Sequence, residues 1–193
     1  MYPTVLSRYL LLIFLLLPCP AMGVVSGSQT PASFNRDSFQ VPFITNDGQI
    51  GSEVAFYTLT SNGTVYVQKD GGIVYAMKGG RDLILTESFI GGRRSNVAGG
   101  IRSDTLVNCY SGSDPSKWRE AVSTFLSLEL GRKYEFIDVC LTVAQGTVEK
   151  IFTVHPGGDV ANIRGRITNA ESLQIDRSGH LLVLSSCGTI QFT

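Results

Sequence analysis

Short apolar runs of about five to eight residues, separated by glycine, asparagine and aspartate, recur from Phe39 to the end of the chain. Several runs alternate apolar and polar residues, as strands do when they bury one face. The pattern predicts an all-β fold of about a dozen short strands, with at most one or two single-turn helices. Two antiparallel sheets packed face to face as a β-sandwich are the simplest arrangement of such strands.

The runs predict strands at residues 54–60, 64–68, 73–77, 83–89, 122–130, 136–143, 147–154, 163–167, 173–175, 180–184 and 189–192. The clearest hairpin joins the first two, because Asn62-Gly63 supplies two residues that tolerate positive φ in a tight turn. A meander is expected to continue through the turn at 69–72. Gln145-Gly146 and the segment 176–179 predict two later hairpins.

The segment Ser113–Arg119 divides the strands into two series and contains the only tryptophan. Asp114 at an N-cap, followed by Pro115 at the first helical position, predicts one capped turn. We expect Trp118 to point into the core, with Lys117 and Arg119 in water. The alternative is an outward-facing Trp118 that contacts a ligand. A second capped turn is expected from Asp159 to Ile163.

The N-terminus has the pattern of a secretory signal peptide at residues 1–23. Arg8 precedes a nine-residue apolar run, and small residues flank the expected cleavage point after Gly23. Nine helical residues span about 14 Å, too little for a bilayer core of about 30 Å. An uncleaved anchor is the alternative, whereas Pro18 before Cys19 argues against lipid attachment. Residues 24–38 read as a flexible lead-in, and residues 39–193 as a single domain exported to the cell surface or beyond.

Charge gives no reason to expect nucleic acid or an anionic membrane as a partner. Residues 24–193 carry 15 basic and 16 acidic side chains, so their net charge is near zero. No second apolar run approaches the length of a membrane helix, so no transmembrane span is expected after signal cleavage.

Three cysteines remain after the predicted cleavage, Cys109, Cys140 and Cys187. One disulfide plus one free thiol is compatible with export, and so are three buried reduced thiols. Each cysteine lies in an apolar strand-like run, which favours the buried thiols. Neither a CxxC spacing nor a histidine partner indicates a metal or redox site.

Side chains with catalytic potential are sparse. His155 and His180 are the only histidines, and both are flanked by turn residues. Glu149 and Asp138 would suit glycoside hydrolysis only if their carboxyl groups stood about 5–9 Å apart, and a solvated face is the expected role. Asp47, Asp70, Asp159 and Asp176 lie in turns without the alternating ligands of a calcium loop. We therefore expect no catalytic residue, metal or cofactor.

The stretch Gly91-Gly92-Arg93-Arg94-Ser95-Asn96 combines glycines with arginines, as phosphate-binding loops do. Because no helix pattern follows it to supply a dipole, a solvated loop is expected.

Several blocks resemble the DUF7948 domain, a domain of unknown function found before SBBP-type β-propeller repeats in bacterial and archaeal surface proteins. The strongest is Asp114-Pro115-Ser116-Lys117-Trp118-Arg119, and others are 43–49 with 54–57, 86–89, 148–154 with 156–158, and 188–193. The resemblance covers about Pro42 to Thr193. It implies a cell-surface architecture and transfers no catalytic residue. Similar proteins usually continue into repeats, so this chain is expected to be either a stand-alone form or a piece of a longer one.

Two functions follow from these observations. The first is a non-catalytic secreted or cell-surface module that binds protein or displays repeats. The second is a carbohydrate-binding module in which Tyr57, Tyr66, Tyr75 or Trp118 stacks on sugar rings. Coplanar exposed rings would favour the second, and buried rings would remove its basis.

Overall fold

The computed structural model describes residues 41–78, 83–144, 146–186 and 188–192. The predicted signal peptide at residues 1–23 and the lead-in at 24–38 lie outside the described residues, as does Cys187. Along the described segments there is no helix long and apolar enough to cross a membrane.

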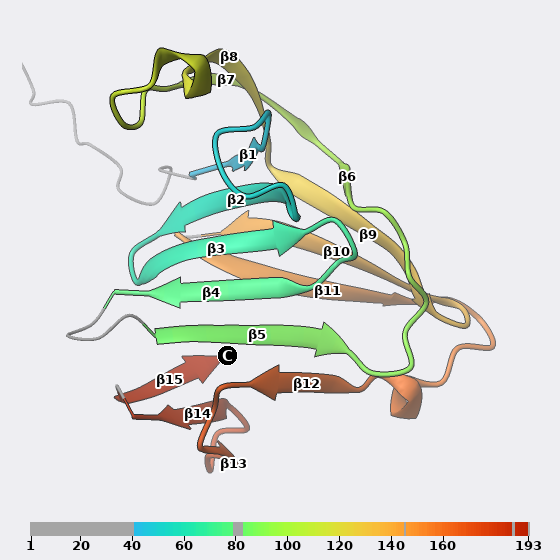
Figure 1. Cartoon of the computed structure of the whole chain (residues 1–193). Helices are drawn as coiled ribbons and strands as arrows, with labels where there is room; N and C mark the ends of the chain where they lie inside the picture. The colour runs from blue at the N-terminus through green and yellow to red at the C-terminus, as the bar shows by residue number, and fades with distance from the viewer. Residues whose placement is uncertain (1–40, 79–82, 145, 187, 193) are drawn as a thin grey trace, which may run out of the picture. The chain divides into compact units, whose positions relative to one another are not determined.

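The described part of the chain consists of fifteen strands and two one-turn 3-10 helices (Figure 1). The strands are β1 (Phe43–Thr45), β2 (Val54–Thr60), β3 (Gly63–Gln68), β4 (Ile73–Met77), β5 (Leu83–Phe89), β6 (Ala98–Gly99), β7 (Arg102–Cys109), β8 (Arg119–Phe125), β9 (Ser127–Tyr134), β10 (Ile137–Ala144), β11 (Thr147–Val154), β12 (Gly165–Thr168), β13 (Ser172–Ile175), β14 (Leu181–Ser185) and β15 (Gly188–Phe192). The helical turns are Pro115–Lys117 and Val160–Asn162. The all-β prediction is confirmed, including the two capped turns.

The strands form three antiparallel sheets rather than the two that were expected. Sheet A has eight strands in the order β12-β5-β4-β3-β2-β1-β8-β7. Sheet B has four, β11-β10-β9-β6, and sheet C has three, β13-β14-β15. The meander β2-β3-β4-β5 forms the centre of sheet A, as predicted from its turns. β12 lies beside β5, and β1 followed by β8 and β7 lies beside β2 (Figure 1).

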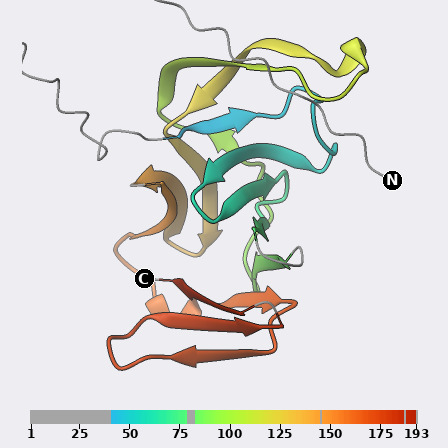
Figure 2. The ribbon, with the colours of Figure 1, turned by 90° about the vertical axis from the view of Figure 1, so that its left-hand side faces the viewer.

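The main core lies between sheets A and B, which Figure 2 shows from the side. Its buried members are Phe43, Phe56, Val65, Val67, Ile73, Leu128, Leu130, Val139, Leu141 and Val143. On β2, β3 and β10 these residues alternate with half-exposed or exposed ones, so one face of each strand is buried. Burial of each such side chain stabilises the fold by about 1.5–3 kcal/mol relative to exposure.

Sheet C packs against sheet A through aromatic and aliphatic side chains on one of its faces. Leu181 pairs with Phe192, and Val183 pairs with Ile190, so all four share that face. Val183 is fully buried, and the Phe192 ring meets Tyr75 of β4 edge to face with centroids 5.4 Å apart. The last strand of the chain therefore packs against the inward side of sheet A.

The β2–β3 hairpin is present, but its turn differs from the expected one. Thr60 pairs with Gly63, so the two turn residues are Ser61 and Asn62. Asn62 is not among the described residues with positive φ, whereas Gly63 has φ of 151°. A Cβ at Gly63 would overlap the Ala76 carbonyl oxygen on β4. Glycine is thus required here by the close approach of the neighbouring strand as well as by backbone conformation.

The expected single strand at 122–130 is instead two strands in different sheets. β8 ends at Phe125 in sheet A, and β9 begins at Ser127 in sheet B. Leu126 lies at the crossing, where its amide donates to the Ile101 carbonyl at 2.7 Å. The break in alternation at Phe125 is the trace of this crossing in the sequence, because the buried face changes there.

Candidate functional site

The loop between β7 and β8 is held in one conformation by its own polar groups. The Asp114 carboxylate accepts hydrogen bonds from the Ser116 amide at 3.0 Å and the Ser116 hydroxyl at 2.7 Å. These bonds lower the pKa of Asp114. With Pro115 at the start of the turn and the Trp118 amide donating to the Pro115 carbonyl, the predicted capped turn is confirmed.

Trp118 lies at the surface, so the prediction that it points into the core is wrong. It is 41% exposed, and Tyr110 beside it is 54% exposed. The two rings meet edge to face with centroids 5.6 Å apart at 80°. We call Tyr110 and Trp118 the aromatic pair. The turn lies at the tip of the hairpin (Figure 1), so the ring packs on Tyr110 rather than on the sandwich core.

Hydrogen bonds fix both rings of the aromatic pair. The Trp118 indole Nε1 donates to the Gly112 carbonyl at 3.2 Å. The Tyr110 hydroxyl donates to Glu120 Oε1 at 2.6 Å, which raises the pKa of that phenol. The pair is therefore exposed yet ordered, as protein-binding aromatic side chains often are.

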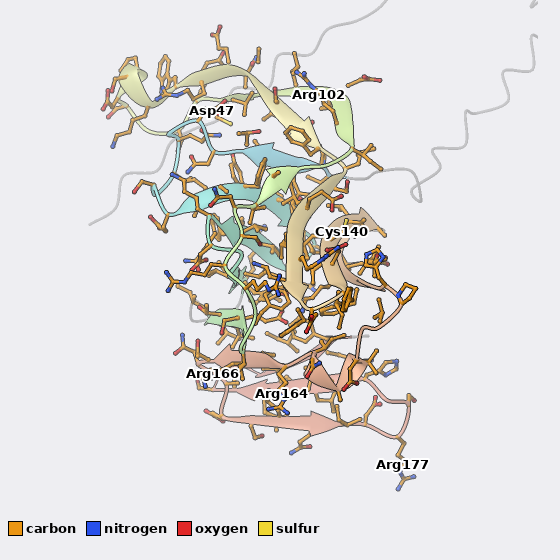
Figure 3. The ribbon with its side chains drawn as sticks, turned by 90° about the vertical axis from the view of Figure 1, so that its right-hand side faces the viewer. Asp47, Arg102, Cys140, Arg164, Arg166 and Arg177 are labelled. Atoms are coloured by element: carbon orange, nitrogen blue, oxygen red, sulfur yellow. The ribbon has the colours of Figure 1, made fainter. Side chains whose placement is uncertain are left out.

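Arg119 ties the hairpin to the loop after β1 and is half-buried, not fully in water as expected. Its guanidinium donates to the Asp47 carbonyl at 2.7 Å, and to the Ser116 and Trp118 carbonyls at 2.7 and 2.8 Å. Asp47 lies at the same end of the molecule as the hairpin in Figure 3. A side chain that bridges two loops limits how far the aromatic pair can move.

The tyrosines of sheet A divide between its two faces. Tyr57 and Tyr66 are directly opposite on β2 and β3, half-exposed, with centroids 6.3 Å apart and planes 33° apart. Burial and a contact with Cys109 raise the pKa of Tyr57 to about 12. Tyr75 lies on the opposite face, against Phe192. The rings do not form one coplanar row, and Tyr75 is excluded from any outer platform.

Cys109 and Cys140 are free thiols that are half-buried rather than fully buried. Cys109 Sγ lies 3.4 Å from the Tyr57 hydroxyl. Burial raises the pKa of Cys140. A raised pKa is the opposite of what a reactive cysteine needs, so Cys140 does not have the surroundings of a nucleophilic thiol.

A buried polar cluster of Tyr75, Glu87 and Lys150 lies between the sheets. Glu87 is only 9% exposed, and its Oε1 is bound by the Lys150 ammonium from β11. The Tyr75 hydroxyl donates to Glu87 Oε2 at 3.0 Å. Burial, followed by the Glu87 charge, raises the pKa of Tyr75 far above its usual range. Each carboxylate oxygen has one partner, so Glu87 holds a proton donor and a cation in place.

The polar cluster was missed by the sequence analysis, although a signal for it exists. Glu87 is in phase with the inward Leu85, and Lys150 is in phase with the inward Val148 and Phe152. A charge at an inward strand position needs a partner. The Lys150 ammonium also lies 5.7 Å from the Phe89 ring centroid.

A cavity of about 540 Å³ borders the polar cluster. Tyr75, Lys150 and Phe152 line one part of it, and the last strand lines another through Gln191 and Phe192. Neither histidine lines this cavity.

The histidines and acids considered as catalytic candidates from the sequence do not come together in one site. His155 binds Asp138 at 2.7 Å, and His180 binds Asp176 at 2.9 Å. Asp138 pairs with Thr153, whereas Glu149 pairs with Thr142, four residues further along β10. This places the two acids about 13 Å apart along the strand, too far for paired glycosidase carboxylates.

Three of the four aspartates that were predicted to form turns do so through their side chains. Asp70, Asp159 and Asp176 each accept a backbone amide two residues ahead, at 3.0, 2.9 and 2.8 Å. Within the described residues, no group of three or more histidine, cysteine, aspartate or glutamate side chains could hold a metal ion.

Comparison with curated proteins and with solved structures finds no match. A family model does match. It describes a domain of unknown function (DUF7948) and covers residues 43–193, which include every described strand. Because the match spans most of the chain, from β1 through the aromatic pair to β15, the chain belongs to the DUF7948 family.

Proposed function

We propose that this chain is a non-catalytic β-sandwich module, secreted or displayed at the cell surface, that binds another protein through its aromatic pair. The observation that carries the proposal is the exposed and hydrogen-bonded arrangement of Tyr110 and Trp118. Tryptophan and tyrosine provide large contact areas and lose little rotamer freedom on binding, because each has two side-chain torsions.

The polar interior supports a non-catalytic role. Glu87, Lys150 and Tyr75 bind one another, and each histidine is paired with one acid. The apolar N-terminal segment supports export, and the resemblance to domains that precede β-propeller repeats supports a place at the start of a longer surface protein.

Carbohydrate binding is the second candidate, favoured by the outward pair Tyr57 and Tyr66. Their planes differ by 33°, so the rings are close to a common surface on which a sugar ring could stack. The aromatic pair is less suited to this role, because its rings stand at 80° to each other.

The test compares Trp118→Ala and Tyr66→Ala in residues 24–193. Capture from the producing organism's surface fraction, followed by a titration with the purified partner, should show at least tenfold weaker binding for Trp118→Ala and normal binding for Tyr66→Ala. A glycan array tests the alternative. Glycan binding that is lost in Tyr66→Ala and kept in Trp118→Ala would refute the protein-binding proposal and establish the second.

A further inference from the structure

A second pocket lies at the end of sheet A, distinct from the aromatic pair. It has a volume of about 180 Å³. Its walls are the β3–β4 turn, the end of β5, the Gly92–Arg94 segment and Lys133 of β9. We propose that this pocket binds an oxyanion group, namely a carboxylate, sulfate or phosphate, through Lys133, Arg93 and Arg94.

Lys133 is the central element of the pocket. Its side chain is only 2% exposed, and its ammonium makes one long hydrogen bond, 3.3 Å, to the Asp70 carbonyl oxygen. An ammonium has three protons to donate, and a buried charge without an ionic partner is costly. Lys150, at 5.7 Å from the same Phe89 ring, has Glu87 as its ionic partner, whereas Lys133, at 5.5 Å, binds only a carbonyl.

The backbone makes room for this ammonium. Gly71 has φ of 89°, and a Cβ at that position would overlap the Lys133 Nζ. The glycine thus lets the lysine reach the turn. Burial lowers the pKa of Lys133, with Asp70 opposing the effect. An anion in contact with the ammonium would favour its charged form.

Two arginines add positive charge at the rim. Arg93 and Arg94 are exposed and line the pocket, and the Arg93 amide donates to the Lys133 carbonyl at 2.7 Å. Neither guanidinium has an acidic partner among the described residues. The lining also contains the carboxylates of Asp70 and Glu87, but Glu87 is neutralised by Lys150. Three cations therefore face one uncompensated carboxylate, a balance that favours an anion.

The sequence alone predicted a solvated loop at Arg93 and Arg94. In the proposed site these two arginines bind the anion together with Lys133, which follows 40 positions after Arg93. The absence of a helix dipole argued against phosphate binding here, but side-chain cations supply the positive charge instead. The volume suits a single oxyanion and one or two attached groups, such as the carboxylate or sulfate of an acidic saccharide.

Calorimetric titration of residues 24–193 with sodium phosphate and sodium sulfate, against sodium chloride at matched ionic strength, tests the site. The wild type should show saturable binding of the oxyanions. Arg93→Ala/Arg94→Ala should bind at least about tenfold more weakly. Arg102→Ala/Arg177→Ala removes the same charge from two exposed arginines outside the pocket, labelled in Figure 3, and should bind like the wild type.

A second arm distinguishes the sources of the oxyanion. A sulfated and a uronic-acid disaccharide are titrated alongside the free anions, and tighter binding of a disaccharide would identify a saccharide as the carrier. Equal binding would identify the free anion. Absence of saturable oxyanion binding, or equal weakening in both double variants, would overturn the proposal. These outcomes leave the aromatic pair untouched, because it belongs to another part of the chain.

Discussion

Two tyrosines in this domain make the same bond in opposite surroundings. Tyr75 donates to Glu87 at 3.0 Å between the sheets, and Tyr110 donates to Glu120 at 2.6 Å at the hairpin tip. The first bond is buried beside a lysine, and the second is in water. A buried hydrogen bond to a charged group contributes to stability, because its loss leaves both groups without a partner. At an exposed site water can replace the lost partner, so the same bond contributes less. The interior pair is therefore expected to stabilise the fold, and the exterior pair to orient a binding surface.

The largest effect is expected from Glu87→Ala. It removes the partner of both Lys150 and Tyr75, and stranding a buried cation costs about 3–5 kcal/mol of the free energy of unfolding. Urea denaturation followed by fluorescence measures the change. The triple variant Tyr75→Phe/Glu87→Leu/Lys150→Met replaces the whole polar cluster by apolar groups and should recover most of that loss. A loss below 1 kcal/mol in Glu87→Ala would show that water reaches the polar cluster.

A smaller effect is expected from Tyr75→Phe, about 1.5–3 kcal/mol, because one hydrogen bond to a charged acceptor is lost. The exterior counterpart Tyr110→Phe should unfold like the wild type. Equal losses in the two variants would contradict the contrast between interior and exterior.

Alkaline pH should reveal the same contrast. Folding raises the pKa of Tyr75 above the ordinary value of 10.0, so the unfolded chain loses its phenolic proton first as pH rises. The stabilisation is complete below pH 10 and declines above it. Tyr57, with its pKa raised to about 12, contributes to the decline between these values. Urea midpoints at pH 9 and pH 11 should differ less in Tyr75→Phe than in the wild type, and an unchanged difference would argue against a buried phenol.

Among the substitutions by alanine, the smallest loss of stability is expected from Trp118→Ala, below about 1 kcal/mol, because the ring packs mainly on Tyr110. A core tryptophan would cost about 3–5 kcal/mol instead. Urea denaturation followed by circular dichroism measures it, because this variant lacks the only tryptophan, and Tyr66→Ala serves as a second variant with a half-exposed ring. A loss near the larger figure would mean that the aromatic pair supports the fold and would weaken its assignment to binding.

Local signals predicted much of this fold. The alternation of apolar and polar residues, together with the turn residues, predicted the β2–β3 and β10–β11 hairpins. Aspartate followed by proline predicted the capped turn at Asp114. These features depend on neighbours in sequence. The crossing at Leu126 was missed although the break in alternation at Phe125 marks it, because an apolar run has the same pattern in one strand as in two.

The sites were less predictable, because they depend on contacts between distant strands. Lys150 meets Glu87 across 63 residues, and Lys133 meets Asp70 across the same separation. The alternation along a strand can place a charged side chain on the inward face. The order of strands in the sheets decides which other side chain it contacts. The prediction that Trp118 is buried was wrong for a related reason. The hydrophobicity of the side chain favours burial, but the hairpin tip lies too far from the core for the ring to reach it.

The strand order of sheet A also bears on how the chain folds. Short turns join β2 to β5, so these strands can pair early. The outer partners of β1 and β5 are β8 and β12, which lie about 80 residues further along the chain, so these pairs form only later. Closing such long loops before the contacts form is slow. During synthesis the central meander emerges with both edges unpaired, at a stage when it is most able to pair with another copy. Folding of this domain should therefore be limited by late edge closure and should benefit from a chaperone that shields β1 and β5 until the second half of the chain arrives.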